Sequence, residues 1–301
     1  MRLSHSTRTG GLWLVLPRFH HVLSLTMTET TLAFIGGGNM TRSLIGGLVS
    51  DGWNPARIHV ADPDPQQLEL LARRFSVATT TDNGDAVNNA DAVVLAIKPQ
   101  MVRPVATELA PLIRERRPLV ISIAAGIREA SLRGWLDRDI AIVRAMPNTP
   151  AMVQSGATAL YANPTVSEAQ HNLAESVLRA VGVAIWVEDE AMMDAVTALS
   201  GSGPAYFFLL MEALTSAGLR LGLPQDTARL LTLQTAFGAA KMALESVEDA
   251  AQLRHRVTSP GGTTERAIGI FQENNFEGIV LQAMQAATAR SRELAAEFGK
   301  G

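Results

Sequence analysis

The sequence has no cysteine among its 301 residues, which excludes disulfides, thiolate metal sites and a cysteine nucleophile. Lysine is scarce as well. Lys98, Lys241 and Lys300 are the only three, so there are few candidates for a catalytic lysine. The six histidines include no pair at i,i+4 spacing, and the sequence therefore predicts no metal site.

Long hydrophobic runs and strong charge are also lacking. The longest apolar run, 205–211, ends at Glu212 and falls short of the roughly 18 residues of a membrane span, so we expect no membrane partner. Residues 27–301 carry 23 basic against 29 acidic side chains, which argues against nucleic acid as a partner. With 47% hydrophobic and 18% charged residues the chain can fill a core, and its length suggests about two domains.

The first 30 residues differ from the rest. They hold Arg, Ser, Thr and His around short apolar runs and carry no acid before Glu29, as transit peptides do, yet they lack a secretory cleavage pattern. We predict an upstream-extended or poorly ordered tail over 1–30, with Met27 as a plausible start. A targeting segment is the alternative, and otherwise we expect a cytoplasmic protein.

Short apolar runs alternate with helix-like stretches through the next part of the chain. Near-continuous apolar strands separated by helices indicate a parallel sheet covered on both faces. We therefore predict an α/β, doubly wound Rossmann-type domain over 31–188. The expected strands are 31–35, 57–61, 90–97, 119–123, 140–145 and 183–187, and the expected helices include 39–50 and 65–75.

Strand patterns stop after residue 189, where long helices are expected over 203–222, 225–245 and 276–298. The first two are apolar around much of their circumference, and such helices must be buried nearly all round. About 110 residues cannot easily do this alone. We therefore predict that 189–301 form an all-α dimerisation domain that buries itself against a second subunit; a self-contained bundle is the alternative.

A glycine loop separates the first expected strand from the first expected helix. Gly36 permits a tight turn, Gly38 lets the backbone approach phosphate oxygens, and the free N–H groups of the helix start hold an anion, so the loop predicts a dinucleotide site. Asp62 ends the second expected strand, where a carboxylate accepts hydrogen bonds from ribose and repels a 2′-phosphate, favouring NADH. Helix capping is an equal alternative for Asp62.

Six motifs, in this order along the chain, resemble the pyrroline-5-carboxylate reductase family. They are FIGGGNM at 34–40, AIKP at 96–99, IAAG at 123–126, MPNTP at 146–150, LSGSGPAY at 199–206 and VTSPGGTT at 257–264. The last two are the most specific, and the likeness spans residues 31 to about 295. It implies an enzyme that reduces 1-pyrroline-5-carboxylate to L-proline with NADPH or NADH, and a homodimer that assembles into a larger ring such as a decamer.

The resemblance also implies where the ligands bind. The implied cofactor contacts are Ile35, Gly36, Gly37, Gly38, Asn39, Met40, Asp62, Asn83, Ala96, Ile97, Lys98, Pro99, Ala124 and Ala125. The implied substrate contacts are Glu190, Ser259, Gly261, Gly262, Thr263 and Thr264. Thr41 stands where the family commonly has Ala, and Asp62 stands where many members have Ser or Asn, so the choice between NADPH and NADH stays open.

The residues suit hydride transfer to a cyclic C=N bond, which needs positioning more than a strong acid because the cofactor carries the difficult step. Residues 259–264 precede a helical run, and their small side chains expose N–H groups as a nest for a carboxylate. Thr264 is the candidate catalytic residue, since its hydroxyl can bond the ring nitrogen; ordinary helix capping is the alternative. Glu190 is otherwise part of a solvated acidic run.

Two other functions are compatible with a dinucleotide fold. A β-hydroxyacid dehydrogenase of similar layout would use a lysine base, for which only Lys241 is available. A non-catalytic dinucleotide sensor would need the first glycine loop and not residues 259–264.

Overall fold

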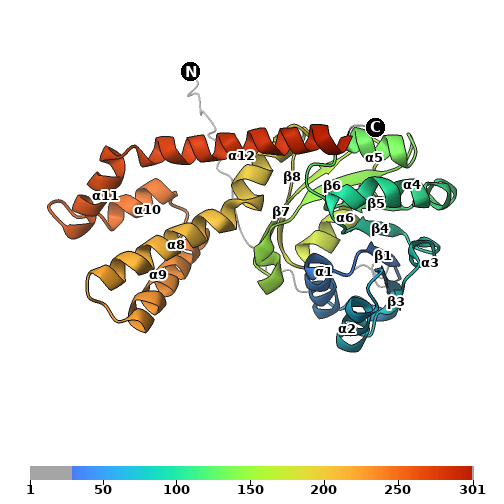
Figure 1. Cartoon of the computed structure of the whole chain (residues 1–301), viewed down its shortest axis with the longest axis horizontal. Helices are drawn as coiled ribbons and strands as arrows, with labels where there is room; N and C mark the ends of the chain where they lie inside the picture. The colour runs from blue at the N-terminus through green and yellow to red at the C-terminus, as the bar shows by residue number, and fades with distance from the viewer. Residues whose placement is uncertain (1–28, 300–301) are drawn as a thin grey trace, which may run out of the picture.

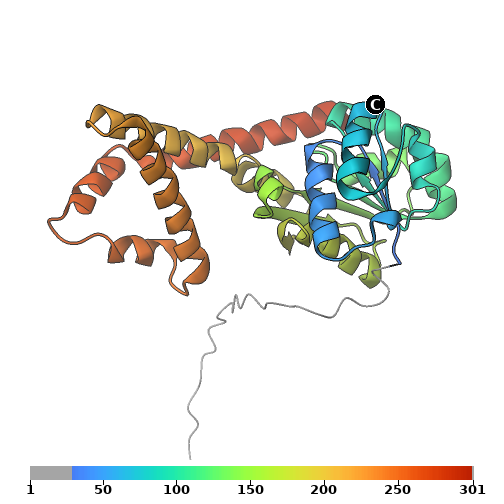
Figure 2. The ribbon, with the colours of Figure 1, turned by 90° about the horizontal axis from the view of Figure 1, so that it is seen from below.

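The computed structural model describes residues 29–299. The predictions for residues 1–28, including the tail and the start at Met27, lie outside the described residues. Figures 1 and 2 show an α/β half built around a twisted sheet and a helical arm that projects from it. Within the described part of the chain, no helix is long and apolar enough to cross a membrane.

The sheet has eight strands in the order β3-β2-β1-β4-β5-β6-β7-β8. Its neighbours are parallel except for the antiparallel pair of β6 and β7. The order reverses between β1 and β4, as in other doubly wound sheets. The strands are β1 (Leu32–Ile35), β2 (Ile58–Ala61), β3 (Ala78–Thr80), β4 (Ala92–Leu95), β5 (Leu119–Ser122), β6 (Ile142–Met146), β7 (Gly156–Ala162) and β8 (Gly182–Trp186).

Helices cover both faces of the sheet, as the apolar strands predict. In β1 the alternate residues Leu32 and Phe34 belong to one buried cluster, whereas Ala33 and Ile35 belong to the other. A strand buried on both faces is therefore apolar throughout. The helices of this half are α1 (Asn39–Ser50), α2 (Pro65–Phe75), α3 (Asn83–Val87), α4 (Pro99–Arg116), α5 (Glu129–Trp135) and α6 (Glu168–Arg179), with 3₁₀ turns η1 (Pro55–Arg57) and η2 (Thr149–Val153).

The parallel Rossmann-type sheet is confirmed, and two of its strands were not predicted. β3 is only three residues long and half-exposed, too short to show a period. β7 contains Gly, Ala and Thr in place of Val and Ile, so its composition did not indicate a strand. β7 returns against β6 after the η2 turn and accounts for the antiparallel pair.

The helical half begins after β8, and its first long helices agree with the prediction. The helices are α7 (Met192–Val196), the π-helical turn η3 (Thr197–Gly201), α8 (Gly203–Arg220), α9 (Gln225–Glu245), α10 (Ala250–Arg256), α11 (Thr263–Glu273) and α12 (Phe276–Gly299). Figure 1 shows α12 running from α11 back to α5. Phe298 near its end packs against the core of the α/β half, so α12 leads from the helical arm back to that half.

Candidate active site

The first glycine loop is held tightly against the neighbouring strands. Gly36 follows β1 with a φ of +101°, and a Cβ at this position would lie 2.5 Å from the carbonyl oxygen of Ala96. The hydroxyl of Thr41, fully buried in α1, donates to the carbonyl of Gly36 at 2.5 Å. Only glycine fits this turn, and Thr41 fastens it to the helix that follows.

The loop borders open space at the start of α1, which we call the cradle. Gly38 is the N-cap residue with no side-chain cap, and a Cβ built on it meets nothing within 4 Å. The first turn of α1 carries no acidic side chain. Free N–H groups, the positive end of the helix dipole and open space together form an anion site of the kind that takes a pyrophosphate.

Asp62 lies directly beside this loop, at the end of β2. Its Oδ2 accepts the Gly37 N–H at 2.6 Å, and its Oδ1 accepts the Asp64 N–H at 2.8 Å. The N-cap of α2 is Asp64, whose side chain accepts the Gln66 N–H. The capping interpretation therefore applies to Asp64, and the carboxylate of Asp62 is directed at the glycine loop.

The other predicted cofactor residues lie at the same carboxyl edge of the sheet. Ala96 to Pro99 follow β4, Ala124 and Ala125 follow β5, and the Ala96 N–H donates to the Ile35 carbonyl at 2.8 Å. Lys98 is exposed and precedes α4 as its N-cap residue. Asn83 begins α3 and donates to Glu108 at 3.4 Å. The edge at which the strand order reverses is where doubly wound sheets bind their ligands.

A cavity of about 370 Å³ lies where the two halves meet, next to this edge. The amide of Asn148, after β6, donates to both the carbonyl and the hydroxyl oxygen of Ser200 at 3.2 Å. Ser200 belongs to the π-helical turn η3, a geometry that often marks a functional site. The MPNTP and LSGSGPAY motifs thus meet through this pair, although sequence reasoning did not single out Asn148. Other lining residues are Pro150, Leu199, Gly203, Pro204, Phe207 and Phe208.

The second glycine loop forms a nest at the start of α11. Gly261 has a φ of +71°, and its N–H donates to the carboxylate of Glu265 at 2.8 Å. Gly262 is the N-cap residue, and the following N–H groups of Thr263 and Thr264 have no acceptor within the helix. The loop therefore already binds one carboxylate, that of Glu265. The sequence could have indicated this contact, because a glutamate in the first turn of a helix can accept from N–H groups at the helix start.

One chain does not bring this nest to the cofactor edge. Figures 1 and 2 both place α11 at the end of the helical arm, away from the sheet. Glu190 lies at neither place, but between β8 and α7. Its Oε1 accepts hydrogen bonds from the Arg144 guanidinium and from the Glu129 N–H, at 2.6 Å each. Glu190 is half-buried and paired, so it is not part of a solvated run. Burial lowers the pKa of Arg144, and the Glu190 carboxylate partly offsets this shift.

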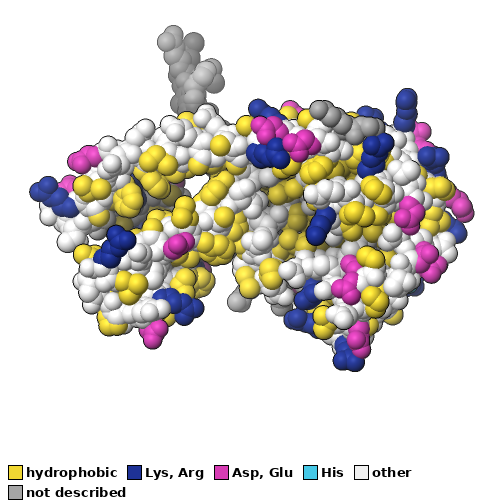
Figure 3. All heavy atoms as spheres, viewed as in Figure 1, with side chains coloured by type: hydrophobic (Ala, Val, Ile, Leu, Met, Phe, Trp, Pro, Cys, Tyr) yellow, Lys and Arg dark blue, Asp and Glu magenta, His cyan; other side chains and the backbone are white. Residues whose placement is uncertain are grey.

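The helical arm exposes a large apolar surface. Figure 3 shows hydrophobic side chains along the arm and around its central opening. A monomer seldom leaves such a face in water, so a partner must cover it. Large side chains of α8 and α9 that are more than 60% exposed include Phe207, Phe208, Leu209, Leu230 and Phe237.

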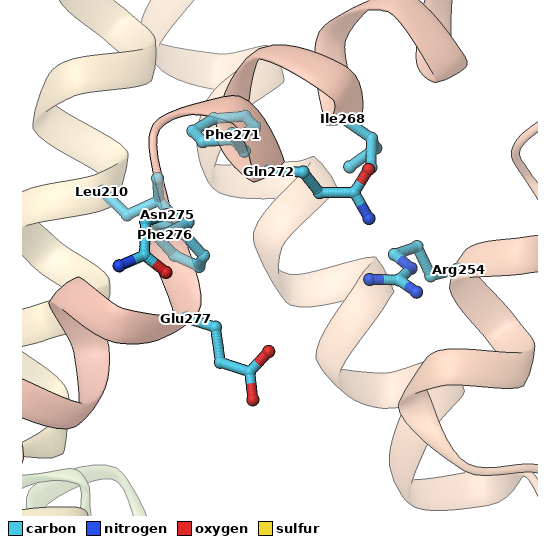
Figure 4. Close-up of a pocket in the computed structure, with 8 residues that line it drawn as sticks. All are labelled: Leu210, Arg254, Ile268, Phe271, Gln272, Asn275, Phe276 and Glu277. Carbon is cyan, nitrogen blue, oxygen red and sulfur yellow. The ribbon is translucent and has the colours of Figure 1, made fainter.

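A hollow of about 430 Å³ adds to this surface (Figure 4). Leu210 of α8, Ile268 and Phe271 of α11, and Phe276 of α12 line it, and the two phenylalanine rings meet edge to face at 5.5 Å. Its other lining residues are polar: Arg254, Gln272, Asn275 and Glu277. Lys241 is 58% exposed and pairs with Glu245 on α9, a poor setting for a general base.

Comparisons with known proteins match both halves of the chain. Residues 190–294 match the family described as pyrroline-5-carboxylate reductase dimerisation. Residues 31–126 match the family described as NADP oxidoreductase, coenzyme F420-dependent. A pyrroline-5-carboxylate reductase of Pseudomonas aeruginosa is 53% identical over 274 residues, which make up 91% of this chain and 100% of that protein.

Solved structures of pyrroline-5-carboxylate reductases are also similar to this chain. A pyrroline-5-carboxylate reductase of Coxiella burnetii is 48% identical, with a TM-score of 0.86 over 88% of this chain and 98% of that one. The Plasmodium falciparum pyrroline carboxylate reductase, solved with NADP bound, is 27% identical, with a TM-score of 0.79 over 89% of this chain and 99% of that one.

Proposed function

The chain belongs to the pyrroline-5-carboxylate reductase family, and we propose that its two glycine-rich loops bind the two reactants of that enzyme. It is an NAD(P)H-dependent oxidoreductase that reduces 1-pyrroline-5-carboxylate to L-proline. NAD(P)H, when bound, supplies a hydride to the carbon of the cyclic C=N bond, and the ring nitrogen takes a proton. The protein's part is to hold the two reactants together and to exclude water.

The cofactor residues of the proposal are those at the carboxyl edge of the sheet. The observation that carries the assignment is the open, uncapped helix start at Gly38, because a dinucleotide needs space and free N–H groups at the same helix start. Asp62 faces the ribose side of that loop, and Ala96 to Pro99 with Ala124 and Ala125 border the nicotinamide side. NAD(P)H oxidation measured with pyrroline-5-carboxylate tests the function; no turnover with either cofactor would contradict it.

Gly38→Asp is expected to abolish cofactor binding while the melting temperature stays unchanged. Aspartate is a good N-cap for α1, and its carboxylate would occupy the place of the phosphates. Gly36→Ala is the contrasting variant, since its Cβ collides with the Ala96 carbonyl and must also lower the melting temperature. Cofactor titration by fluorescence and a thermal melt check both. Tight cofactor binding by Gly38→Asp would show that the pyrophosphate lies elsewhere.

The substrate side of the proposal is the nest at residues 259–264. Its geometry already accommodates a carboxylate, that of Glu265, and the N–H groups of Thr263 and Thr264 are free to take the carboxylate of the substrate. In this proposal the hydroxyl of Thr264 bonds the ring nitrogen as that nitrogen gains its proton. In this proposal Glu190 does not contact the substrate. It pairs with Arg144 and so stabilises the packing between the α/β half and the helical half.

Thr264→Ala is expected to lower kcat by about tenfold to a hundredfold, the value of one hydrogen bond to a charged group. The dissociation constant of the cofactor should not change, because Thr264 bonds the substrate in the proposed site, whereas the start of α1 holds the pyrophosphate. Thr264→Ser keeps the hydroxyl and should restore most of the rate. Steady-state kinetics with both variants measure this; equal rates for the alanine and serine variants would remove Thr264 from the chemistry.

The distance between nest and cradle indicates that the active unit is a homodimer, which the family's dimerisation domain supports. In such a dimer the nest of one subunit faces the cradle of the other, and the exposed faces of α8 and α9 cover each other. Dimers would then assemble into a ring such as a decamer. We also propose a cytoplasmic location and a division into a tail over 1–30, a dinucleotide-binding domain over 31–188 and a helical domain over 189–301.

A further inference from the structure

An ion cluster around one buried carboxylate joins three elements beside the loop that follows β5. The Asp194 cluster consists of Asp194 on α7, Arg128 before α5, and Ser291 and Arg292 on α12. The Asp194 side chain is only 7% exposed, and its Oδ2 accepts from Arg128 at 2.5 Å. Its Oδ1 accepts from the Ser291 hydroxyl at 2.8 Å, and Arg292 lies 3.7 Å away. One carboxylate thus ties α7 and α12 to the start of α5.

The same loop touches α12 directly. Gly126, next to the predicted cofactor contacts Ala124 and Ala125, has a φ of +75° and packs against α12 without a side chain of its own. A Cβ there would lie 3.3 Å from Phe298 and 3.4 Å from Leu294. The last turns of α12 therefore form one wall of the loop at residues 123–128.

We propose that Asp194 is a positioning residue for the cofactor: it clamps α12 and Arg128 so that the loop carrying Ala124 and Ala125 stays against the nicotinamide. This inference rests on the proposed cofactor edge. Arg128 follows Ala125 by three residues, so its side chain anchors the loop at one end, while Leu294 and Phe298 support Gly126 from behind. Asp194 bonds both Arg128 and Ser291 of α12, so it connects the two supports of this loop.

The charges explain why this carboxylate matters. With asparagine in its place, Arg128 and Arg292 lose their shared counter-charge, and one amide oxygen is left to accept where two carboxylate oxygens had accepted from Arg128 and from the Ser291 hydroxyl. Arg128 keeps only its second contact, a 3.4 Å hydrogen bond to the Glu190 carbonyl. Arg292 is 67% exposed, so water screens its repulsion with Arg128, and the larger loss is the ion pair that holds Arg128, which is 26% exposed.

Asp194→Asn is expected to raise the dissociation constants of both NADH and NADPH by about tenfold, and Ser291→Ala by a smaller factor. The matched control is Glu293→Gln, which removes an exposed carboxylate from the same turn of α12 and should change neither constant. Cofactor binding is measured by fluorescence in the absence of substrate. It is therefore readable even if the wild-type enzyme fails to turn over pyrroline-5-carboxylate, an outcome that would contradict the proposed function and not this one.

If Asp194 only stabilised the fold, the variants would change the melting temperature and not the cofactor constants. If Asp194→Asn lowers the melting temperature while the folded protein keeps its wild-type cofactor constants, the positioning role is wrong. If Asp194→Asn does not fold, Ser291→Ala decides, because it removes one hydrogen bond and no charge. Unchanged cofactor binding in Ser291→Ala would then overturn the proposal.

Discussion

Two variants that are each inactive, Gly38→Asp and Thr263→Asp, are expected to recover about a quarter of the wild-type activity when they are co-expressed in equal amounts. The first variant loses the cradle and keeps the nest. The second keeps the cradle and places a carboxylate in the nest, where it repels the carboxylate of the substrate. Aspartate is favourable in the first turn of a helix, so α11 should still form.

The recovery follows from the placement of the two loops. Figures 1 and 2 separate α11 from the glycine loop within one chain, so in the proposed homodimer each site would take its cradle from one subunit and its nest from the other. Random pairing makes about half of the dimers mixed, and each mixed dimer has one intact site and one doubly damaged site. One intact site in about four therefore remains overall.

Specific activity per subunit, measured after co-purification, gives the result. The control pairs Gly38→Asp with a chain that carries both substitutions; no arrangement of these two chains contains an intact cradle, so this mixture should stay inactive. If the Gly38→Asp and Thr263→Asp mixture is also inactive while size measurements show dimers, nest and cradle act within one chain and the shared-site proposal is wrong.

Much of the fold could be predicted from sequence patterns that involve only a few neighbouring residues. The limits of α1, α2 and α9 follow from caps, prolines and glycines, and the structure has these helices where they were expected. The turn at Gly36 is equally local, because a left-handed φ next to a carbonyl admits no other residue. Such features depend on a few adjacent residues, and a single sequence therefore contains them.

Contacts between distant segments were not predictable in this way. Asp194 and Ser291 are 97 residues apart, and neither lies in a motif, so only the path of α12 back to the α/β half joins them. The two alternatives for Asp62, a ribose contact and a helix cap, could not be separated from the sequence, because only the structure shows that Asp64 caps α2 and that Asp62 contacts the glycine loop. Sequence patterns indicated the chemistry of the site, and tertiary packing decides which groups meet.

Asp62→Ser is expected to shift the ratio of kcat/KM for NADPH over NADH toward NADPH by about tenfold to a hundredfold. The carboxylate lies at the loop, where Gly37 donates to it at 2.6 Å, and it faces the ribose of the bound cofactor in the proposed site. A 2′-phosphate there meets a like charge at a half-buried position, whereas a 2′-hydroxyl donates to it. Serine removes the repulsion and offers a donor to the phosphate.

Two further variants separate charge from hydrogen bonding. Asp62→Asn retains an acceptor for the Gly37 N–H and loses only the charge, so it should produce most of the shift if repulsion is the cause. Asp64→Ser makes the same chemical change two residues along the chain, keeps a helix cap, and should leave the ratio at its wild-type value. A shift of equal size in Asp62→Ser and Asp64→Ser would mean that the net charge of the β2–α2 turn, and not the Asp62 contact with the ribose, sets the cofactor preference.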